Sequence, residues 1–379
     1  MHIKKLEVKN FRNHKSTIVN FSQGTNILVG DNAQGKTNLL EAVCLTCVGR
    51  GWRTRKDKEM INFESDLASV KTITAKKFGN IEIEVGISKQ SKKTIQINKI
   101  PIQKMGELMG QINCVFFSPD ELRLIKDAPS DRRRFLDIDI SQLDKVYFYN
   151  LLRYHKVLAQ RNALLKSAAT EDIESGLDIW DRELAKTGTY IIKKRIEFLD
   201  LLRPLTEKVH SFLVSGKETI SLVYEKNIDI IITHNVKDSV NETNDILNLS
   251  INNAESIFLD ALKKSRTKDM KLRTTNIGPH RDDIYISIND KDVRTFASQG
   301  QQRTVALSLK LAELELFKNL TNETPVLLLD DVLSELDESR QSRLFQAIKD
   351  CQSIITTTAL PENIIDINII NVYKGQILE

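Results

Sequence analysis

Residues 30–37 read GDNAQGKT, and this octapeptide constrains the fold more than any other part of the sequence. It matches the pattern G-x-x-x-x-G-K-[ST] and stands between an apolar strand pattern ending at Val29 and a helical pattern from about Lys36 to Val48. A strand, a glycine-rich turn and a helix together let backbone N–H groups and the helix N-terminus point at phosphate oxygens. The segment therefore predicts an α/β fold that binds a nucleotide.

The residue types in this loop indicate which atoms would meet the nucleotide. Lys36 is expected to bridge the β- and γ-phosphates, and Thr37 to offer its hydroxyl to Mg²⁺. An ordinary glycine turn before a helix is the alternative, but such a turn has no need for the Lys-Thr pair. The predicted nucleotide contacts are Gly30, Asp31, Asn32, Ala33, Gln34, Gly35, Lys36, Thr37 and Asn38.

PVLLLDD, at 325–331, has the form of an apolar strand that ends in two carboxylates. In a P-loop ATPase the first, Asp330, belongs to the Mg²⁺ shell. The second, Asp331, is placed to orient the attacking water or accept its proton, so Asp331 and Lys36 are the predicted catalytic residues. An acidic strand end at the surface is the alternative. SELD, at 334–337, follows directly and also fits a helix cap with acidic residues in the first turn.

SQGQQR, at 298–303, stands at the start of a strongly apolar helical run. Ser298 and Gln301 have the S-x-x-Q spacing of a capping box, in which each side chain satisfies the backbone N–H of the other residue. The box does not explain Gly300 or the Gln-Arg pair that follows Gln301. A glycine in the first turn admits an oxyanion to free N–H groups, so the segment also predicts a second phosphate site.

Composition places the chain among soluble globular proteins, with 41% hydrophobic and 28% charged residues. No apolar run approaches the ~20 residues that span a membrane. The first residues, MHIKKLEVKNF, lack the apolar core of a signal peptide. We therefore expect a cytoplasmic protein, and the cysteine content agrees with that compartment.

Cys44 and Cys47 form a C-x-x-C pattern, which also occurs in metal and redox sites. No second pair or nearby histidine completes a zinc set. Both cysteines lie within a helical apolar pattern, so we interpret them as small buried hydrophobic side chains.

Three local basic clusters, at 50–58, 132–134 and 263–273, carry more information than the net charge of +4. Three clusters in one chain favour a partner with a phosphate backbone. Each cluster also fits a solvated face or an internal partner of acidic residues.

Periodicity separates an α/β part from a helical part. Alternating residues predict strands near the N-terminus, an antiparallel meander over 68–98 and a short buried strand at 114–117. From about Asp131 to Val214 the pattern is that of antiparallel helices. After this come weaker strand patterns at 219–224 and 228–233 and a helix at about 254–265. The C-terminal part then alternates helices and strands and ends in a hairpin through 373–375.

The simplest architecture has three segments. Residues 1–125 and 275–379 form one α/β ATPase lobe with a mixed sheet and an antiparallel subdomain. Residues 126–274 form a mainly helical lobe inserted between them.

The order of P-loop, serine-glycine-glutamine segment, double aspartate and S-x-L-D resembles that of ABC-type ATPases, in the branch shared by the SMC and RecF proteins. NFRNH (10–14), FFSPDELRLIKDAPSDRRRFLD (116–137), GPHRDD (278–283) and SQGQQR are similar to RecF motifs, and together they cover the whole chain. About 150 residues stand where SMC proteins insert a very long coiled coil. The chain is identified as a member of the RecF family.

This resemblance implies an ATP-dependent homodimer with two ATP molecules between facing heads. Ser298, Gly300 and Gln301 of one subunit would contact the γ-phosphate held by the P-loop of the other. Arg12 and Asn13 would lie near the nucleotide, and Ser334 and Asp337 would form a loop that crosses the dimer interface.

The resemblance also implies a biological role: a weak, DNA-stimulated ATPase that acts as a switch on double-stranded and gapped DNA. RecR is the implied partner, with RecO and RecA in the same pathway. The implied outcome is the loading of RecA at single-strand gaps during DNA replication, recombination and damage (SOS) repair. The implied location is the nucleoid.

Three places in the sequence depart from many ABC ATPases. Ser118-Pro119 stands where a glutamine is usual, as in RecF, and Thr356-Thr357-Thr358 stands where a switch histidine is usual. Asp331 replaces the usual glutamate and is one methylene shorter, which is consistent with slow turnover.

Three other classes fit less well. An ABC transporter subunit would carry a signature closer to L-S-G-G-Q and would lack RRRFLD and GPHRDD. An SMC-like head that only tethers DNA is the main alternative, and it needs a coiled coil or hinge. A fused nuclease would need a further acidic metal cluster.

Overall fold

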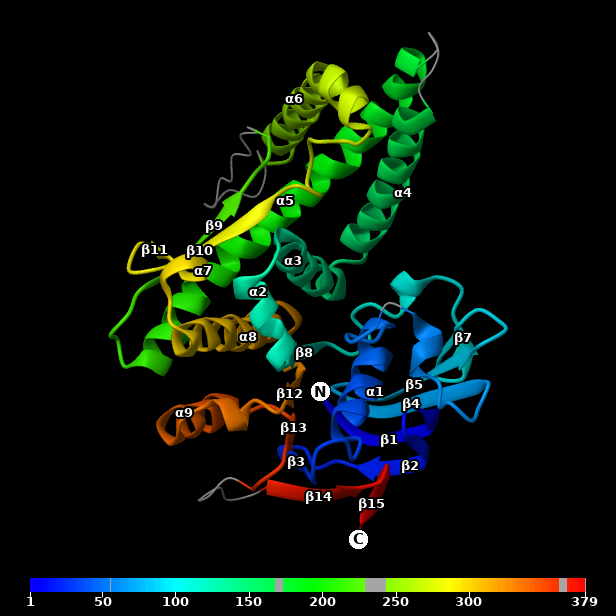
Figure 1. Ribbon diagram of the computed structural model, residues 1–379, viewed down its shortest axis with the longest axis vertical. Coiled ribbons are helices and arrows are strands. Elements are labelled where there is room, and N and C mark those ends of the chain that lie inside the picture. The colour runs from blue at the N-terminus through cyan, green and yellow to red at the C-terminus, as the bar shows by residue number, and fades with distance from the viewer. Residues whose placement is uncertain (55, 168–172, 229–242, 361–366, 379) are drawn as a thin grey trace. The chain divides into compact units, whose positions relative to one another are not determined.

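A computed structural model describes residues 1–54, 56–167, 173–228, 243–360 and 367–378 (Figure 1). The chain divides into two compact units. Unit 1 comprises Met1–Lys126, Leu202–Ile220 and Ile288–Glu379, and unit 2 comprises Asp127–Leu201 and Ser221–Ser287. None of the helices in the described ranges combines the length and the apolar character that crossing a bilayer requires.

The centre of unit 1 is a mixed sheet with the strand order β15-β14-β3-β13-β12-β8. Every pair in it is parallel except β14 with β15, which form the predicted C-terminal hairpin. Its strands are β3 (Thr25–Val29), β8 (Cys114–Phe117), β12 (Val326–Asp330), β13 (Ser353–Thr357), β14 (Ile367–Tyr373) and β15 (Gln376–Leu378). β12 and β13 are buried along their whole length, as strands covered on both faces should be.

A second sheet in unit 1 is antiparallel throughout, with the order β2-β1-β4-β5-β6-β7. Its strands are β1 (His2–Phe11), β2 (His14–Asn20), β4 (Leu67–Lys76), β5 (Gly79–Ser88), β6 (Thr94–Ile97) and β7 (Ile100–Pro101). Buried and half-buried residues alternate along β4 and β5, because only one face of this sheet lies on the core. The predicted meander over 68–98 is confirmed.

Helix α1 (Lys36–Val48) lies between these two sheets and packs against β1, β4 and β5 as well as β8, β12 and β13. Nearly all of its residues are therefore buried, including Cys44 and Cys47, which are free thiols. Their interpretation as small buried side chains is confirmed. Within the described residues, no three or more histidine, cysteine, aspartate or glutamate side chains gather in a way that could hold a metal ion.

Unit 1 also contains several helices and one further short strand. They are η1 (Asp57–Met60), η2 (Met105–Glu107), η3 (Pro119–Leu122), α2 (Arg123–Lys126), β11 (Lys291–Asp292), α7 (Val293–Phe296), α8 (Gln299–Thr321), η4 (Leu333–Glu335) and α9 (Glu338–Ile348).

Unit 2 is mainly helical. It contains α3 (Pro129–Leu143), α4 (Lys145–Ser167), the first part of α5 (Ile173–Val214), α6 (Thr243–Leu272), β9 (Ile220–Glu225) and β10 (Asp283–Ile288). β9 confirms the strand predicted at 219–224 and pairs with β10. Of the strand predicted at 228–233, all but Ile228 lies outside the described residues.

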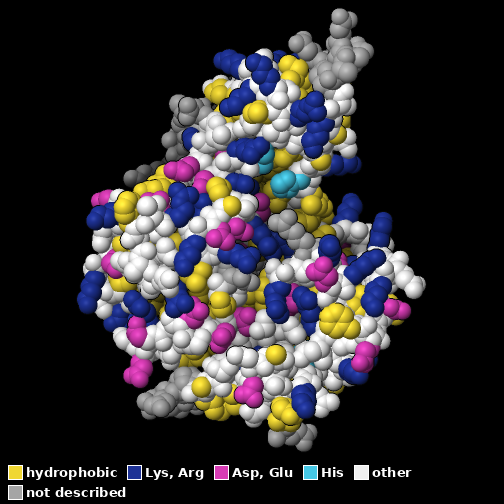
Figure 2. Space-filling view, in the orientation of Figure 1, with side chains coloured by type: hydrophobic (Ala, Val, Ile, Leu, Met, Phe, Trp, Pro, Cys, Tyr) yellow, Lys and Arg dark blue, Asp and Glu magenta, His cyan; other side chains and the backbone are white. Residues whose placement is uncertain are grey.

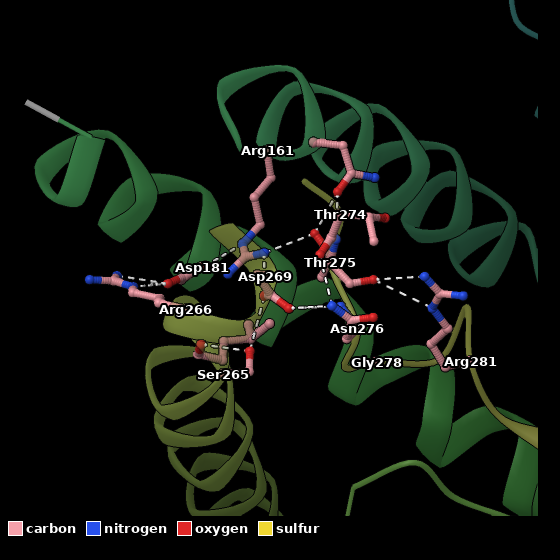
Figure 3. Close-up of polar contacts among 12 residues, drawn as sticks. Arg161, Asp181, Ser265, Arg266, Asp269, Thr274, Thr275, Asn276, Gly278 and Arg281 are labelled. Carbon is pink, nitrogen blue, oxygen red and sulfur yellow. Dashed lines mark hydrogen bonds and ion pairs between the residues drawn. The ribbon is translucent and has the colours of Figure 1, made fainter. Parts of the chain in front are cut away.

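A buried ionic network joins α4, α5 and α6 in unit 2 (Figure 3). The Arg161 guanidinium donates to Asp181 Oδ1 and to Asp269 Oδ2, both at 2.7 Å, and none of these three side chains is exposed. Asp269 also accepts hydrogen bonds from Ser265 and from Asn276. The network therefore holds the loop that leads to the GPHRDD segment.

His280, within GPHRDD, is bound on both sides of its ring. Nε2 lies 3.0 Å from Thr275 O, and Nδ1 lies 2.7 Å from the Tyr154 hydroxyl. Because a carbonyl can only accept, Nε2 carries the proton and Nδ1 accepts from Tyr154. Burial lowers the pKa of His280 to about 4, so the ring is neutral at physiological pH.

The two units differ from the lobes expected at 1–125, 126–274 and 275–379 in two places. Residues 202–220 group with the α/β unit, and 275–287 group with the helical unit. The end of α5 packs on unit 1, where Arg343 of α9 donates to Leu213 O at 2.8 Å. Periodicity indicates where a helix runs, but not what each part of it packs against.

Candidate nucleotide-binding site

The P-loop leaves β3 and enters α1 through a backbone shape that requires glycine. Gly35 is the N-cap of α1 with φ 110°, and a Cβ there would meet the side chains of Asn13 and His14 at 2.7 Å. A Cβ on Gly30 would lie only 2.3 Å from Val372 O. The two glycines therefore let the loop pack against β14 and the loop after β1.

Lys36 is directed back over this loop. Its Nζ donates to Asp31 O at 2.8 Å and also to Gly30 O. Burial lowers the pKa of Lys36, whereas the nearby Asp331, Asp330 and Asp31 raise it. The ammonium is thus held among loop carbonyls and acidic side chains, where an incoming phosphate can exchange for the carbonyls.

Asp330 is the last residue of β12, and its side chain contacts residues of α1 and β13. Its Oδ1 accepts a hydrogen bond from the Thr37 hydroxyl and another from the Thr356 hydroxyl, each at 2.7 Å. The strand order β3-β13-β12 explains this meeting, because the carboxyl ends of parallel strands share one edge of the sheet.

Asp330 and the following Asp331 have different environments. Burial raises the pKa of Asp330, although the hydrogen bonds from Thr37 and Thr356 and the charge of Arg53 lower it. Asp331 follows with φ 50° and donates its N–H to Thr356 Oγ1 at 2.9 Å. Its Oδ1 is buried with no hydrogen-bond partner among the described residues. A hydroxyl beside buried carboxylates fits a divalent cation.

The loop between β1 and β2 packs on the P-loop through Asn13. Its Nδ2 donates to Gln34 O at 3.1 Å, and its Oδ1 accepts from Asn38 Nδ2 at 2.8 Å. Arg12 is directed instead to Glu41 of α1, with Nη2 2.9 Å from Oε2. The structure therefore places Asn13 against the loop itself and Arg12 against the following helix.

Two supports of the P-loop were not predicted. His14 is fully buried, with Nε2 3.1 Å from Gly35 O and Nδ1 2.8 Å from Gly375 O. Lys374, in the β14–β15 turn, donates its N–H to Gln34 Oε1 at 2.6 Å. His14 directly follows the N-F-R-N motif and was open to prediction from that position, whereas Lys374 carries no local signal.

The capping box at the start of α8 is confirmed. Gln301 N donates to Ser298 Oγ at 3.3 Å, and Ser298 N donates to Gln301 Oε1 at 2.9 Å. Ser298 is exposed, and a Cβ added to Gly300 would find no atom nearer than Arg340 Nη1 at 3.9 Å. Packing against the described residues therefore gives no reason for glycine at position 300.

Three further side chains of SQGQQR, those of Gln301, Gln302 and Arg303, have partners within unit 1. Gln301 Nε2 donates to Glu218 Oε1 at 2.9 Å, and Gln302 Nε2 donates to Val293 O at 3.2 Å. Arg303 forms an ion pair with Glu335 at 2.7 Å, which ties α8 to the SELD segment. The arginine is thereby explained by a contact within the chain.

The SELD segment also contains the helix cap that was its alternative interpretation. Asp337 Oδ1 accepts from Arg340 N at 2.9 Å and caps α9. Ser334 Oγ donates to Asp331 O at 2.9 Å, so this loop is linked to the acidic pair.

Two of the basic clusters contribute internal ion pairs. Arg132 is buried and donates to both carboxylate oxygens of Asp283, at 2.6 and 2.9 Å. Arg266 pairs with Asp181 at 2.7 Å and also with Asp178. Figure 2 shows the other lysine and arginine side chains spread over this face rather than gathered in one patch. These two arginines are therefore structural.

A P-loop before a buried helix, a double aspartate at the end of a parallel strand of the same sheet and a serine-glycine-glutamine helix start define an ATPase head of the ABC type. The family described as RecF/RecN/SMC N terminal domain matches residues 2–372. The chain belongs to this family, and within it to the RecF proteins.

Similar proteins support this assignment over the full length. The DNA replication and repair protein RecF of Agathobacter rectalis is 44% identical over 383 residues, which cover 100% of this chain and 99% of that protein. RecF of Clostridium botulinum (strain ATCC 19397 / Type A) is 43% identical, covering 96% of this chain and 94% of that protein.

Solved structures agree. A structure of the recombination mediator protein RecF-ATP in the RecFOR pathway has a TM-score of 0.87 at 37% identity, covering 99% of this chain and 96% of that one. An SMC head bound to the C-terminal winged-helix domain of ScpA has a TM-score of 0.55 at 15% identity and shares the fold.

Proposed function

We propose that this protein is an ATP-dependent DNA-binding protein of recombinational repair that dimerises around two ATP molecules. In each composite site, the P-loop of one chain would hold ATP. Ser298, Gly300 and Gln301 of the second chain would then contact its γ-phosphate. Slow hydrolysis to ADP and phosphate, stimulated by DNA, would separate the two chains.

The observation that carries this proposal is the outward-facing start of α8. Ser298 is exposed, and the space beside Gly300 is open, although no packing among the described residues requires a glycine there. The P-loop meanwhile is supported by Asn13, His14 and the β14–β15 turn, which are separate from the partners of α8. Two half-sites with separate supports are what a symmetric dimer with two shared nucleotides needs.

ATP is supported as the nucleotide by the similar RecF-ATP structure. Lys36 would contact the β- and γ-phosphates once they replace the carbonyls of Gly30 and Asp31. Thr37 and Asp330, joined by a 2.7 Å hydrogen bond, would hold Mg²⁺, which neutralises developing phosphate charge. Asp331, whose Oδ1 is buried without a hydrogen-bond partner in the part of the chain that the structure describes, would orient the attacking water.

The DNA-related part of the proposal rests on family membership and on the basic clusters at 50–58, 132–134 and 263–273. The ligand would be double-stranded DNA with single-strand gaps, in the nucleoid, with RecR as a direct partner and RecO and RecA acting in the same pathway. Duplex affinity should fall steeply with salt, by roughly one power of concentration per phosphate contacted. A flat response to salt would remove DNA-backbone binding from the proposal.

Three variants test the composite site by analytical ultracentrifugation with ATP and duplex DNA. Lys36→Met should lose ATP-dependent dimerisation, because the P-loop can no longer hold the γ-phosphate. Ser298→Arg should bind ATP as a monomer but fail to dimerise. Asp331→Asn should accumulate as a dimer that does not hydrolyse ATP. Dimerisation of Ser298→Arg at the ATP concentrations that suffice for the unsubstituted chain would overturn the composite site.

A further inference from the structure

Glu218 contacts the serine-glycine-glutamine segment from outside the helix that carries it. Its Oε1 accepts the 2.9 Å hydrogen bond from Gln301 Nε2, and its side chain is mostly buried. Gln301 is thereby held at both ends, because its Oε1 accepts from Ser298 N in the capping box. The side chain that closes the cap therefore cannot rotate without breaking the contact with Glu218.

The second oxygen of Glu218 faces a buried histidine. His210, on the last turns of α5, has no exposed side-chain surface, and its Nε2 lies 3.4 Å from Glu218 Oε2. Its Nδ1 lies 3.0 Å from Ser308 Oγ, and Ser308 in turn donates to Thr304 O at 2.7 Å. In Figure 1 this end of α5 runs beside α8.

These contacts determine where the protons lie. Ser308 has one hydroxyl proton and uses it on a carbonyl, so His210 Nδ1 must be the donor to Ser308 Oγ. In a neutral ring, Nε2 of His210 then has no proton to donate to Glu218 Oε2. Only an additional proton, on either the ring or the carboxylate, would allow a hydrogen bond between these two atoms. Burial lowers the pKa of His210, and Glu218 raises it. A glutamine at 218 would supply an N–H to the neutral ring without any such proton.

Glu218 also has a distinctive place in the chain. It lies in segment 202–220, which belongs to unit 1, yet the chain continues into unit 2 at both ends of that segment, along α5 and along β9. Glu218 therefore lies two residues before the end of this segment at Ile220, where the chain passes into unit 2.

We propose that Glu218 is a positioning residue for the composite ATP site: it holds Gln301 so that Ser298 and the adjacent amides can meet the γ-phosphate bound by a second copy of the chain. The inference rests on the proposed function and adds that segment 202–220 controls the α8 half-site. Glu218 acts through Gln301 and does not touch the nucleotide.

The test compares three variants by the ATP concentration that gives half-maximal dimerisation. Glu218→Ala should raise it about tenfold or more, since a hydrogen bond to a charged group is lost. Glu218→Gln should stay within about threefold, because it keeps the acceptor for Gln301 and donates to His210. The matched control is Glu315→Gln, which breaks a 2.9 Å ion pair between Lys208 of α5 and α8 and leaves the cap untouched, so no change is expected.

A second readout separates positioning from general destabilisation. Binding of a fluorescent ATP analogue by dilute monomer reports the P-loop alone, so Glu218→Ala should match the unsubstituted chain there. In a Gln301→Ala background, Glu218→Ala should add little further effect, because its action passes through Gln301.

Dimerisation of Glu218→Ala at the unsubstituted ATP requirement would overturn the inference. An equal weakening by Glu315→Gln, or full additivity with Gln301→Ala, would do the same. An unsubstituted chain that stays monomeric with ATP would refute the proposed function itself. A different pattern would refute the role of Glu218 and leave the proposed function standing. In that pattern the unsubstituted chain dimerises with ATP, Ser298→Arg does not, and Glu218→Ala dimerises at the same ATP concentration as the unsubstituted chain.

Discussion

Thr356 should be essential for the geometry of the acidic pair. Its hydroxyl donates to Asp330 Oδ1 at 2.7 Å and accepts from Asp331 N at 2.9 Å, and the side chain is buried. Thr356→Val keeps the shape and removes both contacts. Loss of one hydrogen bond to a charged group costs about 1.5–3 kcal/mol. That cost corresponds to a roughly 10- to 150-fold lower kcat/KM for ATP, since about 1.4 kcal/mol is a factor of ten.

The pH dependence gives this prediction an independent check. The hydrogen bond from Thr356 lowers the pKa of Asp330, against the larger effect of burial, which raises it. Thr356→Val should therefore raise the pKa of Asp330 further. The carboxylate is the form that would bind Mg²⁺. On acidification, Thr356→Val should therefore lose ATPase activity at a higher pH than the unsubstituted chain, and it should need more Mg²⁺ to reach its half-maximal rate.

The assay is steady-state phosphate release as a function of ATP, Mg²⁺ and pH, with Thr357→Val as the matched control. The Thr357 hydroxyl donates its proton to Ala359 O at 2.8 Å, so it is not available to either aspartate. The reasoning is refuted when Thr356→Val hydrolyses ATP like the unsubstituted chain, or when Thr357→Val shows the same loss and the same pH shift.

Three further predictions concern stability and turnover. Arg161→Met leaves Asp181 and Asp269 buried without their shared cation and should cost about 3–5 kcal/mol in the free energy of unfolding of unit 2, measured with urea; a cost under about 1 kcal/mol would contradict the buried network. For His280 the folded pKa, about 4, lies below the ordinary histidine value of 6.5, so its contribution to stability is complete above pH 6.5 and is lost as pH falls through about 4. His280→Gln should remove that part of the acid destabilisation, whereas an unaltered pH–stability curve would count against it. Asp331→Glu should hydrolyse ATP faster because the longer side chain reaches the water position better, and unchanged or slower phosphate release would show that side-chain length is not what limits turnover.

The parts of the site that could be predicted depend on residues close together in the sequence. The pattern at 30–37 specifies both a phosphate-binding turn and the helix after it, and S-x-x-Q specifies a cap whose two members are three positions apart. Each of these signals lies within eight consecutive residues or fewer. The structure accordingly confirms α1 and the capping box.

The contacts that could not be predicted join distant positions. Gln301 and Glu218 are 83 residues apart, and His14 and Gly375 are 361 apart. The role of Thr356 depends on β13 lying between β3 and β12, and strand order is not contained in the periodicity of any one strand. The placement of 202–220 in unit 1 likewise depends on what the end of α5 packs against.

The central claim is that the start of α8 in one chain meets the P-loop of another. One chain carries Ser298→Cys and the other carries Asn32→Cys, and both substituted positions are exposed. The four native cysteines are buried, so a short thiol-to-thiol cross-linker reports only the introduced pair. The account predicts that an equimolar mixture forms a covalent heterodimer with ATP but not with ADP, and that neither chain alone does so. A mixture that dimerises with ATP yet gives no cross-link, or gives the same yield with ADP, would contradict it.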